Sequence, residues 1–262
     1  MTVSLFSQLE VDQFKHDGYI FVRGMFNREE MQLLQTVSRN DQQLQDKAWH
    51  VKDVGGVAAK ITLWTTAADD VYGLVARSRR VVDRMEQLLD GEVYHYHSKM
   101  SMKEPFTGGA FEWHQDYGYW YQNQFLFPDM ASCFIAVDKQ TEENGCLQVL
   151  KGSHLLGRVQ HGRFGDQTGA DPERVDEARK VCELMNCIME AGDALFFHAN
   201  TLHGSSQNRS AQPRWSLICC YTAANNLSGK LEMHPCEQIR KVEDSALMSL
   251  ASTSAADEPH PT

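Results

Sequence analysis

The amino-acid sequence predicts a mostly β fold with flanking helices, and three observations support this prediction. Amphipathic helical patterns dominate the first third of the chain. From residue 92 onward, short runs rich in apolar, β-branched and aromatic residues follow one another at close spacing. Turn-forming residues such as Pro105 and Gly192 separate these runs. Together these patterns indicate an antiparallel sandwich or barrel with helices packed around it.

The N-terminal part, over about residues 1–91, is expected to be largely helical. Asn27 followed by Glu30 is the pattern of a capping box, which places the start of a helix at residue 28. A turn at Asp17 and Gly18 separates an earlier short helix from a strand. The expected elements are helices that start near residues 9, 28 and 68 and a strand over residues 19–26.

The β core is expected over about residues 92–235 and completes a single domain over residues 1–250. The expected strands cover residues 92–103, 111–120, 131–139, 145–153, 194–208 and 214–224. Residues 155–180 interrupt this pattern, because they are polar, rich in glycine and too long for a hairpin loop, so we expect an ordered lid or a mobile surface segment. Residues 251–262 have the small, polar composition of a disordered tail.

Composition excludes several classes of function. The chain has 25 Lys and Arg against 35 Asp and Glu, a net charge of −10, which disfavours nucleic acid and anionic membranes as partners. No apolar run approaches the roughly 18 residues of a membrane span. The seven cysteines are odd in number and include no Cys-x-x-Cys pair, which indicates reduced thiols. We therefore expect a cytoplasmic protein, with no obligate protein partner implied.

The motif His114-x-Asp116 is the first candidate for chemistry. Residues two apart on a strand face the same side, so both side chains could bind one ion. Two histidines and one carboxylate leave coordination positions open, as in non-haem Fe(II) oxygenases, so a second histidine is needed. The other histidines considered are His95, His97, His154, His161, His198, His203 and His234. His203 is favoured, because it lies where a strand bends into small polar residues and a side chain can turn inward.

Arg214 follows His203 by 11 positions and opens the next expected strand. An unpaired guanidinium is costly to bury, so an arginine in the wall of an apolar barrel requires an anionic partner. A dicarboxylic cosubstrate would supply that partner.

Four motifs in this order resemble the phytanoyl-CoA dioxygenase family of Fe(II)/2-oxoglutarate oxygenases. They are His114-x-Asp116, the segment TEENGCLQVLKGSH at residues 141–154, His203, and Arg214-x-Ser216. The resemblance spans roughly residues 9–235, and the family includes ectoine hydroxylase and 2-aminoethylphosphonate dioxygenase. It implies a double-stranded β-helix, the jelly roll of cupin-like proteins, and an enzyme that uses Fe(II), 2-oxoglutarate and O2.

The resemblance also implies roles for individual residues. His114, Asp116 and His203 would bind the iron, and Arg214 and Ser216 would bind the far carboxylate of 2-oxoglutarate. The strand before the metal motif would contribute cosubstrate contacts from His97, Lys99 and Ser101. Related halogenases have a small residue at the position of Asp116, so the aspartate favours hydroxylation.

The sequence favours a small hydrophilic substrate, because an acyl-CoA would need a basic landing patch for its phosphates and the net charge is −10. A small zwitterion is expected, with 2-aminoethylphosphonate or a related aminophosphonate as the specific suggestion. An ammonium group could contact the aromatic cluster of Tyr117, Tyr119, Trp120 and Tyr121 by cation–π interaction. An anionic group could meet Arg158, Arg163 and Arg209.

Three alternatives stay open. One is a hydroxylase of an acyl-CoA or another natural product. A zinc hydrolase could use the same two histidines and aspartate to activate water, but it would leave Arg214 and Ser216 without a role. A non-catalytic metal-binding jelly roll would carry the same residues, and only turnover distinguishes it.

Overall fold

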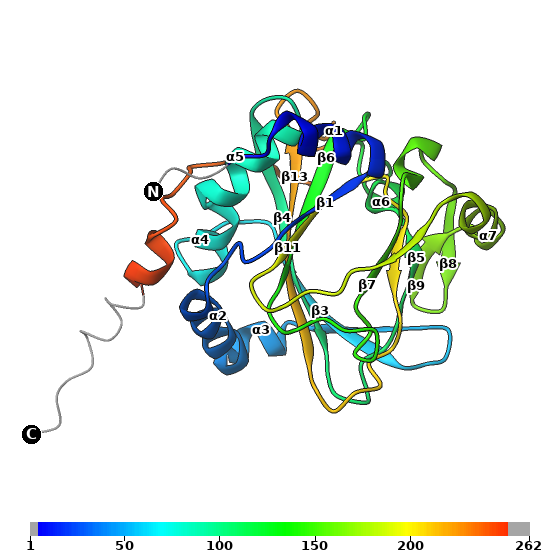
Figure 1. Cartoon of the computed structure of the whole chain (residues 1–262), viewed down its shortest axis with the longest axis horizontal. Coiled ribbons are helices and arrows are strands. Elements are labelled where there is room, and N and C mark those ends of the chain that lie inside the picture. The colour runs from blue at the N-terminus through cyan, green and yellow to red at the C-terminus, as the bar shows by residue number, and fades with distance from the viewer. Residues whose placement is uncertain (1–4, 251–262) are drawn as a thin grey trace, which may run out of the picture.

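The computed structural model describes residues 5–250, so the predicted disordered tail at 251–262 lies outside the described residues. The described chain forms a large and a small antiparallel sheet that face each other, and helices pack on the outside of the large sheet (Figure 1). The predicted mostly β fold with flanking helices is therefore confirmed.

The large sheet has eight strands, and its pairs are antiparallel. In spatial order they are β1 (Tyr19–Val22), β11 (Ala194–His198), β6 (Met130–Ala136), β13 (Arg214–Ala223), β4 (Val93–Lys103), β3 (Ala58–Trp64) and β2 (Trp49–Lys52), while β14 (Glu237–Gln238) pairs with β4. The long central strands β13 and β4 carry most of the predicted cosubstrate residues.

The small sheet has four strands, and a separate two-stranded hairpin extends beside it. The sheet order is β10 (Leu184–Asn186), β7 (Leu147–Leu150), β12 (His203–Ser205) and β5 (Phe111–His114), and the hairpin consists of β8 (His161–Phe164) and β9 (Gln167–Ala170). The hairpin and the helix after it occupy the edge of the molecule beyond the small sheet (Figure 1).

Five helices come from the N-terminal part of the chain, and three short ones lie near the small sheet. They are α1 (Gln8–Asp17), α2 (Arg28–Asn40), α3 (Gln42–Asp46), α4 (Val71–Arg77), α5 (Arg79–Leu88), α6 (Asp116–Trp120), the 3-10 helix η1 (Ser153–Leu156) and α7 (Pro172–Val181). The predicted capping box is present, since Asn27 accepts from the backbone of Glu30 and the Glu30 side chain accepts from the backbone of Asn27. Within residues 5–250, no helix has both the length and the apolar character needed to traverse a bilayer.

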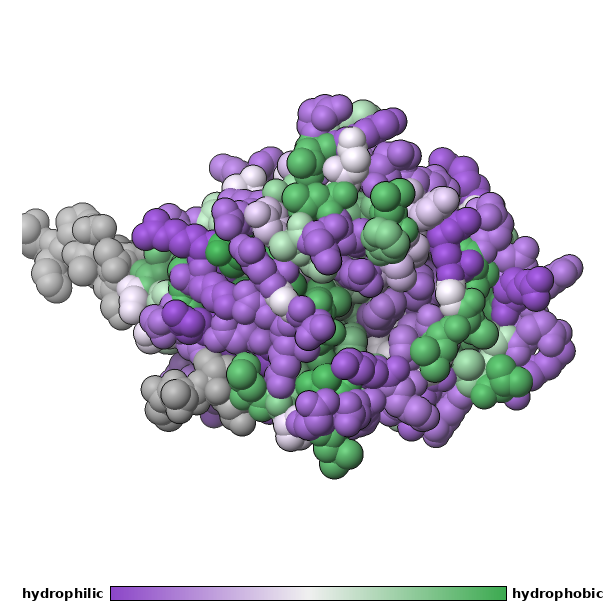
Figure 2. All heavy atoms as spheres, turned by 90° about the horizontal axis from the view of Figure 1, so that it is seen from above, coloured by the Kyte–Doolittle hydropathy of each residue, from purple (hydrophilic) through white to green (hydrophobic). Residues whose placement is uncertain are grey.

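The core has two main layers, one on each face of the large sheet. All seven residues of β6 are buried. Cys133 and Ile135 pack toward the helices, while Phe134 and Ala136 pack into the space between the sheets. On the face seen in Figure 2, hydrophilic side chains surround and interrupt the hydrophobic ones, as expected when helices turn their apolar sides to the sheet.

Two of the expected strands are divided. Residues 194–208 form β11 and β12, which belong to different sheets. Between them the chain turns, because the backbone of Thr201 bonds to the carbonyl of His198 and its hydroxyl donates to the carbonyl of Gly18. Residues 111–120 form β5 and then α6, so Asp116 starts a helix rather than continuing a strand.

The N-terminal part also differs from the expectation in detail. The helical region expected from residue 68 is two helices, because Ser78 has an extended backbone (φ −61°, ψ 142°) and separates α4 from α5. Strands β2 and β3 were not expected in this part of the chain. The segment at residues 155–180 is ordered as η1, the β8–β9 hairpin and most of α7.

Candidate active site

The three predicted metal ligands come from two neighbouring strands and the start of a helix. His114 ends β5, His203 begins β12, and the two residues are directly paired in the antiparallel register. Asp116 is the first residue of α6. Gln115 between the two motif residues keeps an extended backbone (φ −111°, ψ 135°), so the side chains of His114 and Asp116 still lie on the same side.

These side chains form a cluster suited to one metal ion. One ligand atom from each lies within 4.8 Å of the others, and the Nε2 atoms of His114 and His203 are each 4.0 Å from Oδ1 of Asp116. The Nδ1 atom of His114 lies 2.7 Å from the carbonyl oxygen of Glu112, and that of His203 lies 2.9 Å from the carbonyl oxygen of Thr201. Because a carbonyl only accepts, Nδ1 carries the proton and Nε2 presents its lone pair to the cluster. This donor set fits iron.

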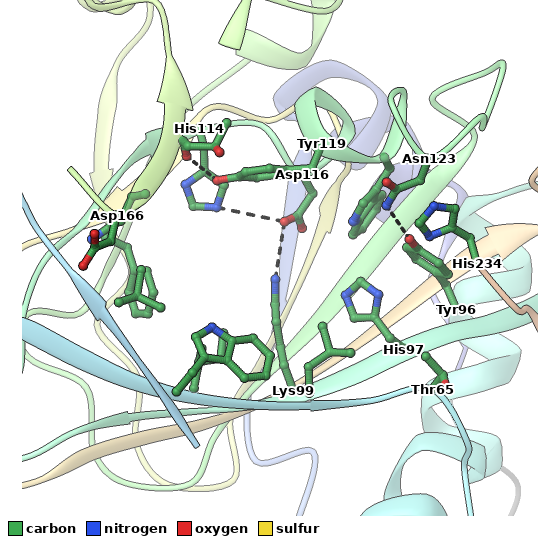
Figure 3. A pocket seen from close by; sticks show the side chains of 18 of the residues that line it. Thr65, Tyr96, His97, Lys99, His114, Asp116, Tyr119, Asn123, Asp166 and His234 are labelled. Atoms are coloured by element: carbon green, nitrogen blue, oxygen red, sulfur yellow. Dashed lines mark hydrogen bonds and ion pairs between the residues drawn. The ribbon is translucent and has the colours of Figure 1, made fainter. Parts of the chain in front are cut away.

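The two oxygens of Asp116 have different partners. Lys99 Nζ lies 3.5 Å from Oδ1 (Figure 3). The hydroxyl of Ser132 donates to Oδ2 at 3.0 Å. Burial alone would raise the pKa of the Asp116 carboxyl, but Lys99 and the two histidines outweigh it and lower that pKa. Burial, and then the neighbouring His203, lowers the pKa of His114. The cluster is therefore an anionic carboxylate beside two neutral imidazoles at neutral pH, the state that binds a metal.

Two neighbouring cavities share residues at this cluster. The outer cavity has a volume of about 560 Å³ and is lined by both sheets, α6 and the tip of the β8–β9 hairpin. The inner cavity, about 50 Å³, lies deeper between the sheets and reaches Arg214. Lys99 and His114 line both cavities, Asp116 lines the outer one and His203 the inner one. The metal cluster therefore forms part of the wall of both cavities.

The inner cavity is built for an anion. Arg214 is 1% exposed, and its Nε donates to Oε1 of Gln140 at 2.7 Å. Among residues 5–250, no carboxylate lies within ion-pair distance of the Arg214 guanidinium. Burial lowers the pKa of Arg214 to about 10, so it remains cationic at neutral pH. Ser101 Oγ, also in this wall, is buried without a hydrogen-bond partner. A carboxylate would satisfy both groups.

The outer cavity combines aromatic walls with a few polar groups. Trp120 packs edge-on against Tyr96 and against His97, with ring centroids 5.5 and 5.6 Å apart. His97 is 6% exposed, and its ring faces the cavity (Figure 3). Asn123 donates to the hydroxyl of Tyr96 at 2.7 Å, which fixes one side of this wall.

The structure brings some predicted site residues into these cavities and leaves others outside. His97 and Trp120 line the outer cavity, Ser101 and Arg214 the inner one, and Lys99 both. The predicted residues that line neither cavity are Ser216, Tyr117, Tyr121, Arg158, Arg163 and Arg209.

These six residues lie outside the two cavities and make other contacts. Ser216 is fully buried and its hydroxyl lies 3.4 Å from the amide nitrogen of Gln140, so it contacts the residue that holds Arg214. Tyr117 is a core residue that donates its hydroxyl to the carbonyl of Phe125. Arg158 stacks on the exposed ring of Tyr121 at 4.4 Å. Arg163 and Arg209 are exposed at the surface.

Tyr119, which the sequence also indicated as a contact for an ammonium group, lines the outer cavity, whereas sequence reasoning missed Asn123, Thr168 and Trp49. Tyr119 packs its ring 5.5 Å from that of His114 and donates its hydroxyl to the carbonyl of Thr168 in β9. Asn123, Thr168 and Trp49 also line the outer cavity. For Thr168, the sequence signal was the length and glycine content of residues 155–180, because the tip of the hairpin in that segment forms one wall of the outer cavity.

Comparisons with known proteins agree with this geometry. A model of the phytanoyl-CoA dioxygenase family matches residues 14–216. The ectoine dioxygenase of Bordetella parapertussis is 26% identical over 233 residues, which cover 83% of this chain and 75% of that protein. The L-proline trans-4-hydroxylase of Streptomyces griseoviridis is 33% identical over 174 residues, which cover 60% of this chain and 65% of that protein.

Solved structures give the same fold. EctD from S. alaskensis with 2-oxoglutarate and 5-hydroxyectoine has a TM-score of 0.75 at 22% identity, over 91% of this chain and 88% of that chain. The epimerase SnoN in complex with Fe3+, alpha ketoglutarate and nogalamycin RO has a TM-score of 0.68 at 19% identity, over 83% of each chain. These likenesses confirm the predicted jelly-roll fold.

Proposed function

The chain belongs to the phytanoyl-CoA dioxygenase family, and from this premise we propose that it hydroxylates a small zwitterionic metabolite at iron held by His114, Asp116 and His203. It is an Fe(II)/2-oxoglutarate-dependent dioxygenase. The observation that carries the proposal is that the metal cluster lines two cavities, one with an arginine that has no carboxylate partner among residues 5–250 and one with aromatic walls.

The metal site is assigned to the three clustered side chains. The carbonyls of Glu112 and Thr201 hold the two imidazoles with Nε2 toward the metal position. When bound, the iron supplies the oxidising chemistry, in which one atom of O2 enters a substrate C–H bond and the other enters succinate as 2-oxoglutarate loses CO2. A zinc hydrolase would not require the buried cation at Arg214.

The inner cavity is assigned to 2-oxoglutarate. Arg214, oriented by Gln140, would hold the distal carboxylate, and Ser101 would donate its free hydroxyl. Lys99 lies between this carboxylate position and the metal cluster, where it can meet the 2-oxo acid end. Apolar side chains such as Phe134 and Ile218 complete the wall and exclude water from the cosubstrate.

The outer cavity is assigned to the substrate. Trp120, Tyr119 and Tyr96 line this cavity, and the face of an aromatic ring attracts an ammonium group. His97 offers a nitrogen donor to an anionic group, so a small zwitterion suits the cavity better than an uncharged molecule. Two of the relatives are named for ectoine and L-proline, both small zwitterions, which supports a cyclic amino acid ahead of 2-aminoethylphosphonate.

The cysteines bear on the cellular location of the protein, and the metal cluster bears on its need for a protein partner. All seven cysteines lie in the described part of the chain and are free thiols, which supports the expected cytoplasmic location. No protein partner is needed to complete the cluster, because its three ligands come from one chain.

The test is substrate-dependent formation of succinate. Purified protein with Fe(II), ascorbate and 2-oxoglutarate is assayed alone and with ectoine, L-proline, 2-aminoethylphosphonate or an acyl-CoA. We expect at least one zwitterion to raise the rate about tenfold or more, with one hydroxylated product per succinate. The His114→Ala/His203→Ala double variant should neither bind iron nor form succinate. Stimulation by the acyl-CoA alone would reject the zwitterion assignment, and full iron occupancy in the double variant would reject the metal site.

A further inference from the structure

Gln115, the residue between the two metal ligands of the motif, is fully buried and uses its whole side-chain amide. Its Nε2 donates to the carbonyl of Gly157 at 2.8 Å and to the carbonyl of Asn200 at 2.7 Å. Its Oε1 accepts from the backbone N–H of Val159 at 2.7 Å. Gln115 therefore joins three segments that are distant in the sequence.

The bond to Asn200 connects the motif to the third metal ligand. Asn200 and Thr201 belong to the turn before His203, and the carbonyl of Thr201 accepts from Nδ1 of His203. The backbone of Tyr117 donates to the carbonyl of Ala199 at 3.0 Å, so the same turn is fastened on the other side of Asp116 as well. A shift of Gln115 would therefore move the carbonyl that orients His203.

The other bonds hold the motif against residues 157–161, which lead into the β8–β9 hairpin and include the first residue of β8. The backbone N–H of Gln115 donates to Nε2 of His161 at 2.9 Å, and Nδ1 of His161 lies 2.8 Å from the carbonyl of Val159. His161 also packs against Gly118, where a Cβ atom would lie 2.1 Å from the imidazole ring. Gln115 is thus held through its backbone and its side chain by residues 157–161.

We propose that Gln115 is a positioning residue of the iron site, which sets the distance between the His114 and Asp116 pair and His203. The proposal rests on the metal site assigned above. The role requires an amide, because two donors and one acceptor act in a space without solvent. A glutamate would present oxygen to two carbonyl oxygens, and a methionine would fill the space without any hydrogen bond.

The experiment measures Co(II) binding to the metal-free protein, with no cosubstrate or substrate present. The variants are Gln115→Met and Gln115→Glu. Gln122→Met and Gln122→Glu are the matched controls, because Gln122 is exposed just after α6 and lines neither cavity. We expect the Gln115 variants to raise the Kd for Co(II) by about ten- to a hundredfold. The visible absorption bands of bound Co(II) should also change, which a purely structural role would not cause.

The results distinguish a failure of the proposed role of Gln115 from a failure of the metal-site assignment. If the unmodified chain and both Gln122 variants bind Co(II) and His114→Ala does not, the metal site stands. Folded Gln115 variants with an unchanged Kd and unchanged absorption bands would then overturn only the role of Gln115. If neither Gln115 variant folds, amide hydrogen exchange of the unmodified chain tests the role of Gln115 instead. Co(II) should slow exchange at Val159 and Gln115 in the unmodified chain, and unaltered exchange at both amides would overturn the proposal.

Discussion

Ser132 donates its hydroxyl to Oδ2 of Asp116 at 3.0 Å, while Oδ1 of the same carboxylate lies 4.0 Å from Nε2 of both His114 and His203. Ser132 is fully buried on β6, in the opposite sheet from both histidines. One sheet therefore supplies the histidines, and the other fixes which carboxylate oxygen meets the metal. Oδ1 of Asp116, together with the two histidines, would then hold the iron, and Ser132 would keep Oδ2 turned away from it.

Ser132→Ala should weaken metal binding by about tenfold, because the carboxylate loses the bond that fixes its orientation. The matched control is Cys220→Ala, since the sulfur of Cys220 is the other contact of the Ser132 hydroxyl, at 3.3 Å. That control removes a contact of similar burial and leaves the bond to Asp116 in place. Calorimetric titration of both metal-free proteins with Co(II) gives the comparison, and equal affinities would show that Ser132 does not orient the carboxylate.

Arg214→Lys should raise the KM for 2-oxoglutarate by about tenfold or more, because a lysine keeps the charge but loses the planar fork that binds a carboxylate through two bonds. Arg163→Lys on the exposed surface of β8 is the control. The KM of the unmodified enzyme should stay flat up to about pH 9, since the pKa of Arg214 is about 10. Burial would lower the pKa of a lysine at this position below its usual 10.4, so the KM of the variant should rise further between pH 7 and pH 9. A variant with the original KM would place the distal carboxylate elsewhere.

The sequence was sufficient to predict the fold class and the cluster of His114, Asp116 and His203, because His-x-Asp spacing and strand patterns are local. His114 and Asp116 lie on one side whether residue 116 continues a strand or starts a helix, since only the extended backbone of Gln115 matters. The division of residues 194–208 between two sheets was not predictable, because it depends on bonds from Thr201 to residues distant in the sequence. Periodicity within the segment carries no information about such contacts.

The substrate wall was only partly predictable for a similar reason. Trp120 and Tyr121 are adjacent in the sequence and chemically alike, yet Trp120 is 3% exposed in the outer cavity and Tyr121 is 47% exposed beside Arg158. A strand, which the sequence indicated here, would place every second residue on one side, whereas α6 places Tyr119 and Trp120 on the side of Asp116. Tyr119 reaches the cavity through the same helical turn.

His95→Gln should make stability less sensitive to acid. His95 is 0% exposed, and burial lowers its pKa from 6.5 to about 4. Below pH 6.5 the unfolded chain binds a proton at this residue and the folded chain does not, so stability falls as pH decreases toward 4. Between pH 6.5 and pH 5, the unmodified protein should lose about 2 kcal/mol more of its unfolding free energy than the variant, at about 1.4 kcal/mol per pH unit.

Urea unfolding of the metal-free proteins at the two pH values measures this difference. His50→Gln on the exposed strand β2 is the control and should follow the unmodified protein. Parallel losses in the unmodified protein and His95→Gln would show that His95 is protonated in the folded state.

Tyr119→Phe should loosen the β8–β9 hairpin without moving the metal ligands. The variant keeps the ring that packs against His114 and removes the hydroxyl that donates to the carbonyl of Thr168. Loss of one such bond, worth about 1 kcal/mol, should raise the rate of limited proteolysis within residues 161–170 about fivefold. Tyr121→Phe is the control, because its ring is exposed. Equal cleavage rates would mean that Tyr119 does not hold the hairpin.

Trp120→Phe should raise the KM for the substrate identified by the succinate screen by about three- to tenfold and leave the KM for 2-oxoglutarate unchanged. The reason is geometric, because Trp120 lines the outer cavity and does not line the inner one. A phenylalanine preserves an aromatic ring against Tyr96 and His97 but offers a smaller and weaker π surface to a cation. Tyr121→Phe is again the matched control, since it changes the neighbouring ring outside the cavity. Steady-state kinetics with each substrate varied in turn separates the two constants, and a rise in both KM values would show that Trp120 supports the whole site rather than the substrate wall.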